Sequence, residues 1–85
     1  MVNDIFDIQG DELVKIKDGY VQEVVIPESV RVIGERVFKG SMVKNVVFPR
    51  TLEIIGREAF YQCSLLRSVT IPSNVKVIMD SAFLF

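Results

Sequence analysis

The chain has 85 residues, ten of them Lys or Arg and eleven Asp or Glu, which gives a formal net charge of −1. The basic residues are dispersed, so the phosphate-neutralising patch of a nucleic-acid-binding protein is missing. No apolar run is long enough to span a bilayer, and no histidine is present to activate a nucleophile or bind a metal. We therefore expect one small domain with no catalytic residues, no membrane insertion and no nucleic-acid partner.

The first 23 residues carry a hairpin pattern. Phe6 and Ile8 alternate with polar residues, the stretch "GDE" is a turn signal, and Leu13 and Ile16 belong to a second apolar segment. We predict that residues 1–23 form a β-hairpin cap over one end of the domain.

The remaining residues repeat one motif three times. The stretch "VVIPESVRVIGERVF" returns as "VVFPRTLEIIGREAF" and as "VTIPSNVKVIMDSAF". Aligning Pro27, Pro49 and Pro72 gives periods of 22 and 23 residues, which are typical of solenoids. Five apolar columns stay in phase: Val24/Val46/Val69, Ile26/Phe48/Ile71, Val30/Leu52/Val75, Ile33/Ile55/Ile78 and Phe38/Phe60/Phe83. We therefore divide the chain into repeat 1 (residues 24–45), repeat 2 (residues 46–68) and an incomplete repeat 3 (residues 69–85).

Each repeat predicts two extended segments and a turn. The β-branched stretches "EVVIP", "NVVFP" and "SVTIP" each end at a proline and indicate short strands, and "SVRVIG", "TLEIIG" and "NVKVIM" indicate a second set. A tight turn or a single helical turn then brings each phenylalanine into the core. The expected fold is mainly β, a repeat solenoid with short parallel strands stacked one per repeat. Met79 stands where the other repeats have Gly34 and Gly56, and it would be strained if this position requires a positive φ.

Charged residues support the same stacking. Equivalent positions of neighbouring repeats should lie about 5 Å apart, and opposite charges recur there: Glu28/Arg50, Arg31/Glu53/Lys76, Glu35/Arg57/Asp80 and Arg36/Glu58. We interpret these columns as charge ladders on solvated faces rather than as a binding site.

The repeat resembles a known family. The pattern V-x-I-P-x-x-V-x-x-I-G-x-x-A-F-x-x-C-x-x-L-x-x-V is met by Val46 to Val69, apart from Phe48 and Leu52, and is similar to the BspA-like leucine-rich repeat. The resemblance extends from Val24 to Phe83. It implies a right-handed leucine-rich-repeat coil behind an N-terminal β cap, with a role in protein recognition or adhesion, often on bacterial surfaces. It supplies no shared catalytic residues.

Candidate binding residues lie at the outward positions of the first strand in each repeat. They form a polar row and then a row of small residues, and the candidates are Glu23, Val25, Asn45, Val47, Ser68 and Thr70. We expect this strand face to bind a protein partner of unknown identity. A second apolar row, Val32, Ile54 and Val77, belongs either to the core, which we favour, or to an interface.

The end of the sequence suggests a second function. The stretch "SAFLF" stops directly after the third phenylalanine, and no polar capping unit follows it. Either the chain is the first part of a longer repeat protein, or a second copy covers the open end. In the second case the chain is a structural self-assembly unit that forms homo-oligomers through Met79, Phe83, Leu84 and Phe85.

The single cysteine, Cys63, excludes an internal disulfide. We interpret it as a small buried residue rather than a reactive thiol. No cofactor is expected, and the acidic residues near the N-terminus do not match a calcium loop. The N-terminus lacks the features of a signal peptide, so the chain as written is expected to be cytoplasmic. A fragment of a longer family member would instead belong on the cell surface or outside the cell.

Overall fold

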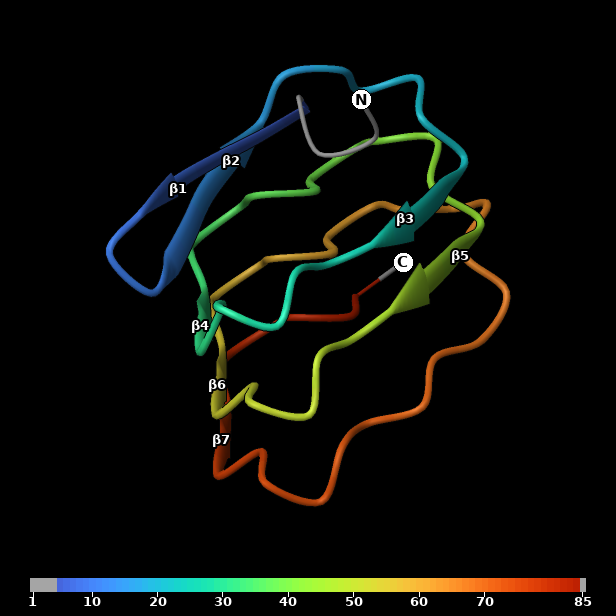
Figure 1. Cartoon of the computed structure of the whole chain (residues 1–85). Helices are drawn as coiled ribbons and strands as arrows, with labels where there is room; N and C mark the ends of the chain where they lie inside the picture. The colour runs from blue at the N-terminus through green and yellow to red at the C-terminus, as the bar shows by residue number, and fades with distance from the viewer. Residues whose placement is uncertain (1–4, 85) are drawn as a thin grey trace.

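The computed structural model describes residues 5–84. These residues form seven short strands in two groups, joined by turns (Figure 1). The strands are β1 (Phe6–Gln9), β2 (Glu12–Ile16), β3 (Glu23–Val25), β4 (Val32–Ile33), β5 (Asn45–Val47), β6 (Ile54–Ile55) and β7 (Val77–Ile78).

The predicted N-terminal hairpin is confirmed. β1 and β2 pair antiparallel, with Phe6 opposite Ile16, and Gly10 occupies the connecting turn with a φ of +64°. A glycine suits this left-handed position because it has no Cβ to clash with the backbone. β2 then pairs in parallel with β4, Leu13 lying opposite Ile33. The hairpin thereby covers the first edge of the repeats.

A five-stranded sheet connects the cap to all three repeats. Its order is β1-β2-β4-β6-β7, and β4, β6 and β7 lie one below the other in Figure 1. These three strands are parallel, and each pairs with the equivalent strand of the next repeat. Val32 lies opposite Ile54, and Ile54 lies opposite Val77. The second extended segment predicted in each repeat is therefore confirmed.

The first predicted strand forms in only two repeats. β3 and β5 pair in parallel, Glu23 opposite Asn45 and Val25 opposite Val47. In repeat 3 the stretch "SVTIP" forms a single β-bridge, between Asn45 and Ser68. The prediction of a third strand here was therefore wrong. Strand preference depends on burial of one face. Ile71 is 37% exposed where Ile26 is 2% exposed, and the segment lacks the burial that holds a strand in place.

Of the two conformations predicted before each phenylalanine, the tight turn is confirmed and the single helical turn is wrong. Arg36, Glu58 and Ser81 occupy the same position in the three repeats and have φ values of 59°, 55° and 57°. A left-handed residue cannot continue a right-handed helix, so each segment bends back after it.

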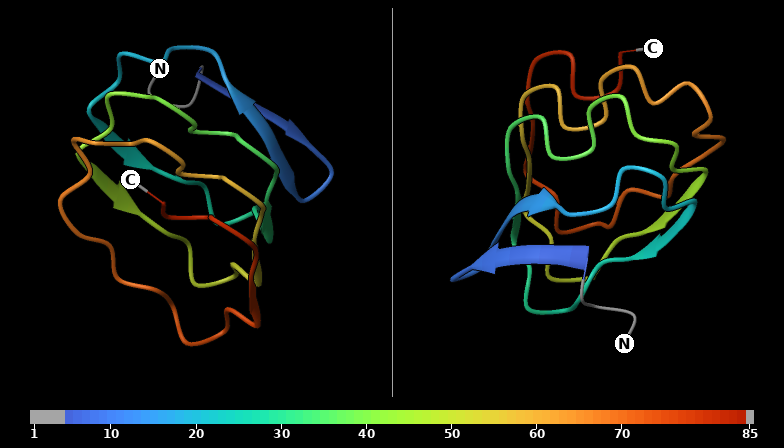
Figure 2. Two further views of the ribbon diagram at one scale, coloured as in Figure 1. Left: turned by 180° about the vertical axis from the view of Figure 1, so that it is seen from behind. Right: turned by 90° about the horizontal axis from the view of Figure 1, so that it is seen from above.

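The turns of neighbouring repeats are joined by backbone hydrogen bonds. The Phe38 N–H donates to the Ala59 carbonyl at 2.7 Å, and the Phe60 N–H donates to the Ala82 carbonyl at 2.7 Å. Figure 2 shows these segments running side by side. The repeats are thus connected along the turns as well as through both groups of strands.

The phenylalanine column forms the centre of the core, as the sequence predicted. Phe60 stacks on Phe38 with ring centroids 4.7 Å apart, and Phe83 stacks on Phe60 at 5.1 Å. The Phe48 ring contacts Phe60 edge-on at 5.8 Å. These contacts link all three repeats through one ring, that of Phe60.

The glycines before the turns are required by space rather than by a positive φ. Neither Gly34 nor Gly56 has a positive φ, and Met79 adopts the same position without one. A Cβ on Gly56 would lie 2.6 Å from the Ile33 carbonyl oxygen and 2.8 Å from the Gly34 carbonyl carbon. Neighbouring repeats therefore approach so closely here that a side chain would push them apart.

The predicted charge ladder forms in part. Arg31 and Lys76 lie 3.7 and 3.9 Å from the carboxylate of Glu53, and Arg36 donates a hydrogen bond of 2.6 Å to Glu58. Among the described residues, the members of the columns Glu28/Arg50 and Glu35/Arg57/Asp80 form no ion pair with one another within 4.0 Å, and Glu35 pairs with Arg36 at 3.2 Å instead. The hydrogen bond from Arg36 holds the pKa of Glu58 below its usual range.

The close approach at Gly56 predicts a large effect of one methyl group. Gly56→Ala should lower the free energy of unfolding by about 1–3 kcal/mol, because the added Cβ separates repeats 1 and 2. Gly19→Ala is the matched control, since nothing lies within 4 Å of its added Cβ, and it should change stability by less than about 0.5 kcal/mol. Urea denaturation of both variants measures the difference. Equal stabilities would contradict the proposed spatial constraint.

The Arg36–Glu58 pair predicts a pH dependence of stability. The pKa of Glu58 is lower in the folded state, so its contribution is present above the unfolded value of about 4.3 and is lost as pH falls through the folded pKa. Glu58→Gln should therefore be less stable than the unaltered chain at pH 7 and should lose less stability below about pH 4.3. Glu28→Gln removes a carboxylate that has no ion pair within residues 5–84, and this variant should follow the unaltered chain. Urea unfolding at a series of pH values tests both curves.

Candidate functional site

The strand face consists of the outward residues of β3 and β5 and their continuation at Ser68 and Thr70. All six predicted binding residues are exposed. Parallel pairing brings Glu23 beside Asn45 and Val25 beside Val47, and the bridge from Asn45 extends the polar row to Ser68. Val25 and Val47 are 65% and 57% exposed, which is high for two neighbouring valines. The structure thus assembles both predicted rows, except that Thr70 lies beyond the last strand bridge.

A hollow lies on the cap side of this face. We call it the first hollow; its volume is about 520 Å³. It lies between the outer edge of β3 and the start of the cap hairpin, and its lining is mostly apolar: Ile5, Phe6, Val21, Glu23, Val24, Val25, Asn45 and Val47. The charged residue of this lining is Glu23.

A second hollow lies on the other side of β5. Its volume is also about 520 Å³, and it is lined by Asn45, Val46, Val47, Phe48, Arg50, Ser68, Val69, Thr70 and Pro72. It opens where the ladder between repeats 2 and 3 ends, after the Arg67 N–H donates to the Lys44 carbonyl at 3.1 Å. Arg50 supplies the charge in this second lining. Asn45 and Val47 belong to both hollows and form the ridge between them.

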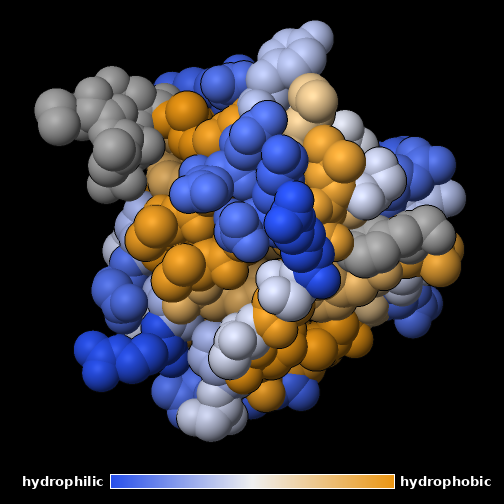
Figure 3. Space-filling view, turned by 90° about the vertical axis from the view of Figure 1, so that its right-hand side faces the viewer, coloured by the Kyte–Doolittle hydropathy of each residue, from blue (hydrophilic) through white to orange (hydrophobic). Residues whose placement is uncertain are grey.

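Figure 3 shows the side of the molecule that carries β3 and β5. Hydrophobic areas lie on both sides of a hydrophilic band, so the face combines apolar contact area with polar groups. Such a mixed surface suits recognition of another protein.

Nine lining residues were not among the predicted binding residues: Ile5, Phe6, Val21, Arg50, Pro72 and four members of the predicted core columns, Val24, Val46, Phe48 and Val69. The first three belong to the cap or its exit, where hydrophobicity alone indicates core rather than a lining. Arg50 and Pro72 follow the strand segments. Because both residues follow a strand segment, the sequence could have indicated that they lie near the strand face. The second hollow itself forms because repeat 3 separates from β5 after a single bridge, which the sequence does not indicate.

The second apolar row is not part of the core. Val32 and Ile54 are half-buried and Val77 is exposed, on the outer side of the five-stranded sheet. The core interpretation that we favoured was therefore wrong. Side chains alternate along a strand, and the neighbouring Ile33 and Ile55 already occupy the inward positions with no exposure.

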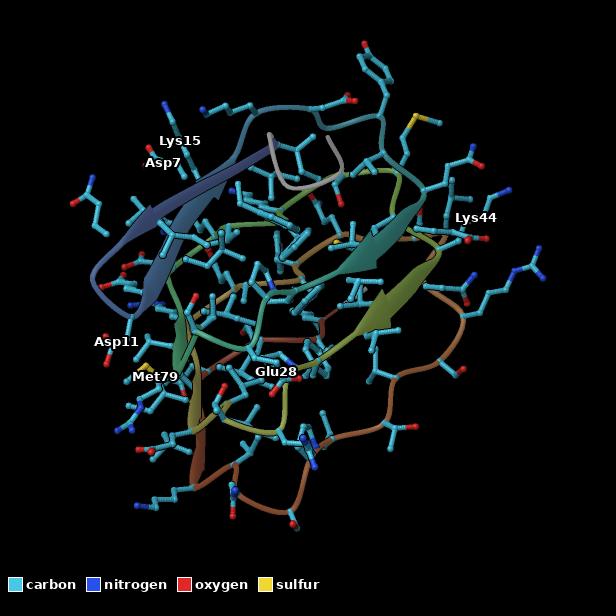
Figure 4. All side chains as sticks on the ribbon, viewed as in Figure 1. Asp7, Asp11, Lys15, Glu28, Lys44 and Met79 are labelled. Atoms are coloured by element: carbon cyan, nitrogen blue, oxygen red, sulfur yellow. The ribbon has the colours of Figure 1, made fainter. Side chains whose placement is uncertain are left out.

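The predicted self-association residues lie at the open end of repeat 3. Met79 and Leu84 are about half exposed, whereas Phe83 is half-buried on the ring of Phe60. Phe85 lies outside the described residues. Figure 4 shows Met79 on the side of the five-stranded sheet and Lys44 at the opposite side, near β5. Met79 therefore lies away from the strand face, whereas Phe83 lines a small hollow together with Ser68 and Val69.

Cys63 is fully buried and hydrogen-bonded. Its thiol donates to the Phe38 carbonyl at 2.9 Å, and its Sγ lies 3.6 Å from the hydroxyl of Ser41, the equivalent residue of repeat 1. Burial raises the pKa of the thiol, an effect that the contact with Ser41 opposes. A buried neutral thiol is a poor nucleophile.

Neither a metal site nor a membrane span is found within residues 5–84. No group of three or more potential metal-binding side chains gathers in this part of the chain. The same residues form no helix with the length and hydrophobicity needed to cross a membrane.

Comparison with known families adds an independent observation. The family model described as "BspA type Leucine rich repeat region (6 copies)" matches residues 17–85. The match covers the three repeats and the end of the cap, which is well over half of the chain. A search of curated proteins finds no match.

The environment of Cys63 predicts that its thiol is protected. In the folded chain it should react with a thiol reagent such as DTNB more than tenfold more slowly than in the urea-unfolded chain, because attack requires an exposed thiolate. Ser64→Cys introduces a thiol at the next residue, which is exposed, and supplies the control. One thiol per chain of this variant should react quickly. Fast reaction of Cys63 itself in the folded chain would contradict the buried assignment.

Proposed function

Because this chain belongs to the BspA-type leucine-rich-repeat family, we propose that it is a protein-interaction module that binds a protein partner through its strand face. The family is a non-enzymatic repeat module that generally mediates protein interaction or adhesion. In this proposal the repeats are part of a right-handed solenoid, and the face formed by β3, β5 and the segment around Ser68 and Thr70 is its binding surface.

One observation carries the proposal: Val25 and Val47 are exposed side by side, Val25 lining the first hollow and Val47 lying on the ridge between the two hollows. A cross-strand pair of side chains such as Val25 and Val47 stabilises a sheet by at most about 1 kcal/mol, so strand stability accounts for little of this exposure. Contiguous exposed apolar surface is instead typical of a site that becomes buried on binding.

The arrangement suits an extended partner segment that crosses β3 and β5. Two apolar side chains of such a segment would enter the two hollows, on either side of the ridge formed by Asn45 and Val47. Glu23 at the first hollow favours a basic residue there, and Arg50 at the second favours an acidic one. The face has only two short strands, so we expect weak, reversible binding of the kind that small interfaces give.

Self-assembly is the second candidate function. It is favoured by the exposure of Ile78, because the other members of its apolar column are buried. Ile33 and Ile55 are fully buried, whereas Ile78, the equivalent residue of repeat 3, is 49% exposed. A core position that stays exposed in one chain would be covered in an oligomer.

The strand-face proposal predicts which variants abolish binding. Peptides selected from a random phage-displayed library on the immobilised chain should lose at least tenfold in affinity for Val47→Asp, because the charge lies between the two hollows. Tyr20→Asp introduces the same charge at another highly exposed residue and should leave the affinity unchanged.

Light scattering and circular dichroism on each variant show whether mass and fold are unaltered. Peptides that bind Val47→Asp as well as the unaltered chain would overturn the proposal for this face. Loss of binding with both variants would do so too, because it would show a general effect of negative charge.

A further inference from the structure

The five-stranded sheet ends in an unpaired edge at β7. This strand is the last in the order of the sheet, and in residues 5–84 no further strand lies beyond it. Val77, Ile78 and Met79 are 43%, 49% and 49% exposed. Three consecutive exposed apolar residues on an edge strand are a template for pairing with another chain.

The backbone at this edge has unused hydrogen-bonding groups. The Arg31 carbonyl accepts from the Glu53 N–H at 2.8 Å, and the Glu53 carbonyl accepts from the Lys76 N–H at 2.8 Å. The Ile33 carbonyl likewise accepts from Gly56, and the Ile55 carbonyl from Met79. The equivalent carbonyls of repeat 3 are those of Lys76 and Ile78. Within residues 5–84, no N–H of another repeat donates a hydrogen bond to either of them.

Charges at the two ends of β7 specify the direction of a second strand. Lys76 precedes the strand and Asp80 follows it, so its ends carry opposite signs. If two copies of β7 paired in parallel, Lys76 would lie beside Lys76 and Asp80 beside Asp80. Antiparallel pairing instead brings the start of one strand beside the end of the other, so each Lys76 lies beside an Asp80.

We propose that two copies of this chain form a dimer by antiparallel pairing of β7 with β7, with a twofold axis at Ile78. The proposal rests on the self-assembly function given above and specifies its surface and register. The axis repeats the Lys76–Asp80 contact twice and covers Val77, Ile78 and Met79 of both copies. It also closes the free edge, so that assembly stops at two chains.

Charge exchange tests this register. The unaltered chain, measured by light scattering after size exclusion over a range of concentrations, should show a monomer–dimer equilibrium. Asp80→Lys and Lys76→Glu should each weaken dimerisation about tenfold or more, which corresponds to about 1.4 kcal/mol, because each creates two like-charge contacts. Lys17→Glu makes the same change of charge as Lys76→Glu, on an exposed residue outside the β7 edge. It should leave the monomer–dimer equilibrium unchanged.

An equimolar mixture of the two weakened variants gives the decisive result. In a mixed dimer the position changed by Asp80→Lys in one copy lies beside the position changed by Lys76→Glu in the other, so a positive charge meets a negative one. At the second contact, the native Lys76 of the first copy lies beside the native Asp80 of the second. Both contacts are then attractive, so the mixture should dimerise about as well as the unaltered chain. Parallel pairing predicts a different series. The unaltered chain would already have two like-charge contacts, so neither single variant would dimerise more weakly than it, and the mixture would dimerise more strongly than it.

The outcomes separate the two levels of the proposal. A chain that stays monomeric at every concentration overturns both the dimer and the self-assembly function. Association that is insensitive to the charge variants, or a mixture that fails to recover, overturns the antiparallel register alone. Circular dichroism and urea unfolding of each variant establish that the altered chains are folded.

Discussion

The close stacking of equivalent residues in successive repeats is the constraint on which the remaining structure depends. A single repeat of 22 or 23 residues is too short to enclose a core, so each apolar column is buried only where another repeat covers it. The backbones of repeats 1 and 2 approach one another so closely at Gly56 that a Cβ there would lie under 3.0 Å from three backbone atoms of repeat 1. This spacing also sets the distance at which the rings of Phe38, Phe60 and Phe83 stack.

The same constraint explains where the molecule is open. At one end the β1–β2 hairpin pairs with β4 and covers repeat 1, whose core residues are buried. In repeat 3 the same columns continue in sequence, but Ile71 and Ile78 are partly exposed because no repeat packs on them in the described part of the chain. Loss of burial also accounts for the missing strand beside β5 and hence for the second hollow. The two proposed interaction surfaces thus have one physical origin, at different places in the fold.

The two surfaces differ in what they offer a partner. Recognition at the strand face depends on the side chains of Val25 and Val47 and on the two hollows. The β7 edge presents backbone groups together with three exposed apolar residues. The first suits a different protein with matching side chains, and the second suits another β-strand. The two proposed surfaces therefore do not compete for the same residues.

The sequence by itself determined the family, the cap hairpin, the register of the repeats and the identity of the core columns. These features depend on local periodicity, and a pattern repeated three times reveals which residues must face inward. The rows of the strand face were predictable for the same reason, because side chains alternate along a strand. Only the tertiary structure decided the conformation of the turns, where a left-handed residue at Arg36, Glu58 and Ser81 replaces the expected helical turn. It also decided that Val32 and Ile54 lie outside the core, that glycine is required by contact between repeats, and that hollows flank β5. These properties depend on distances between residues 22 or 23 positions apart, and no local pattern reports such distances.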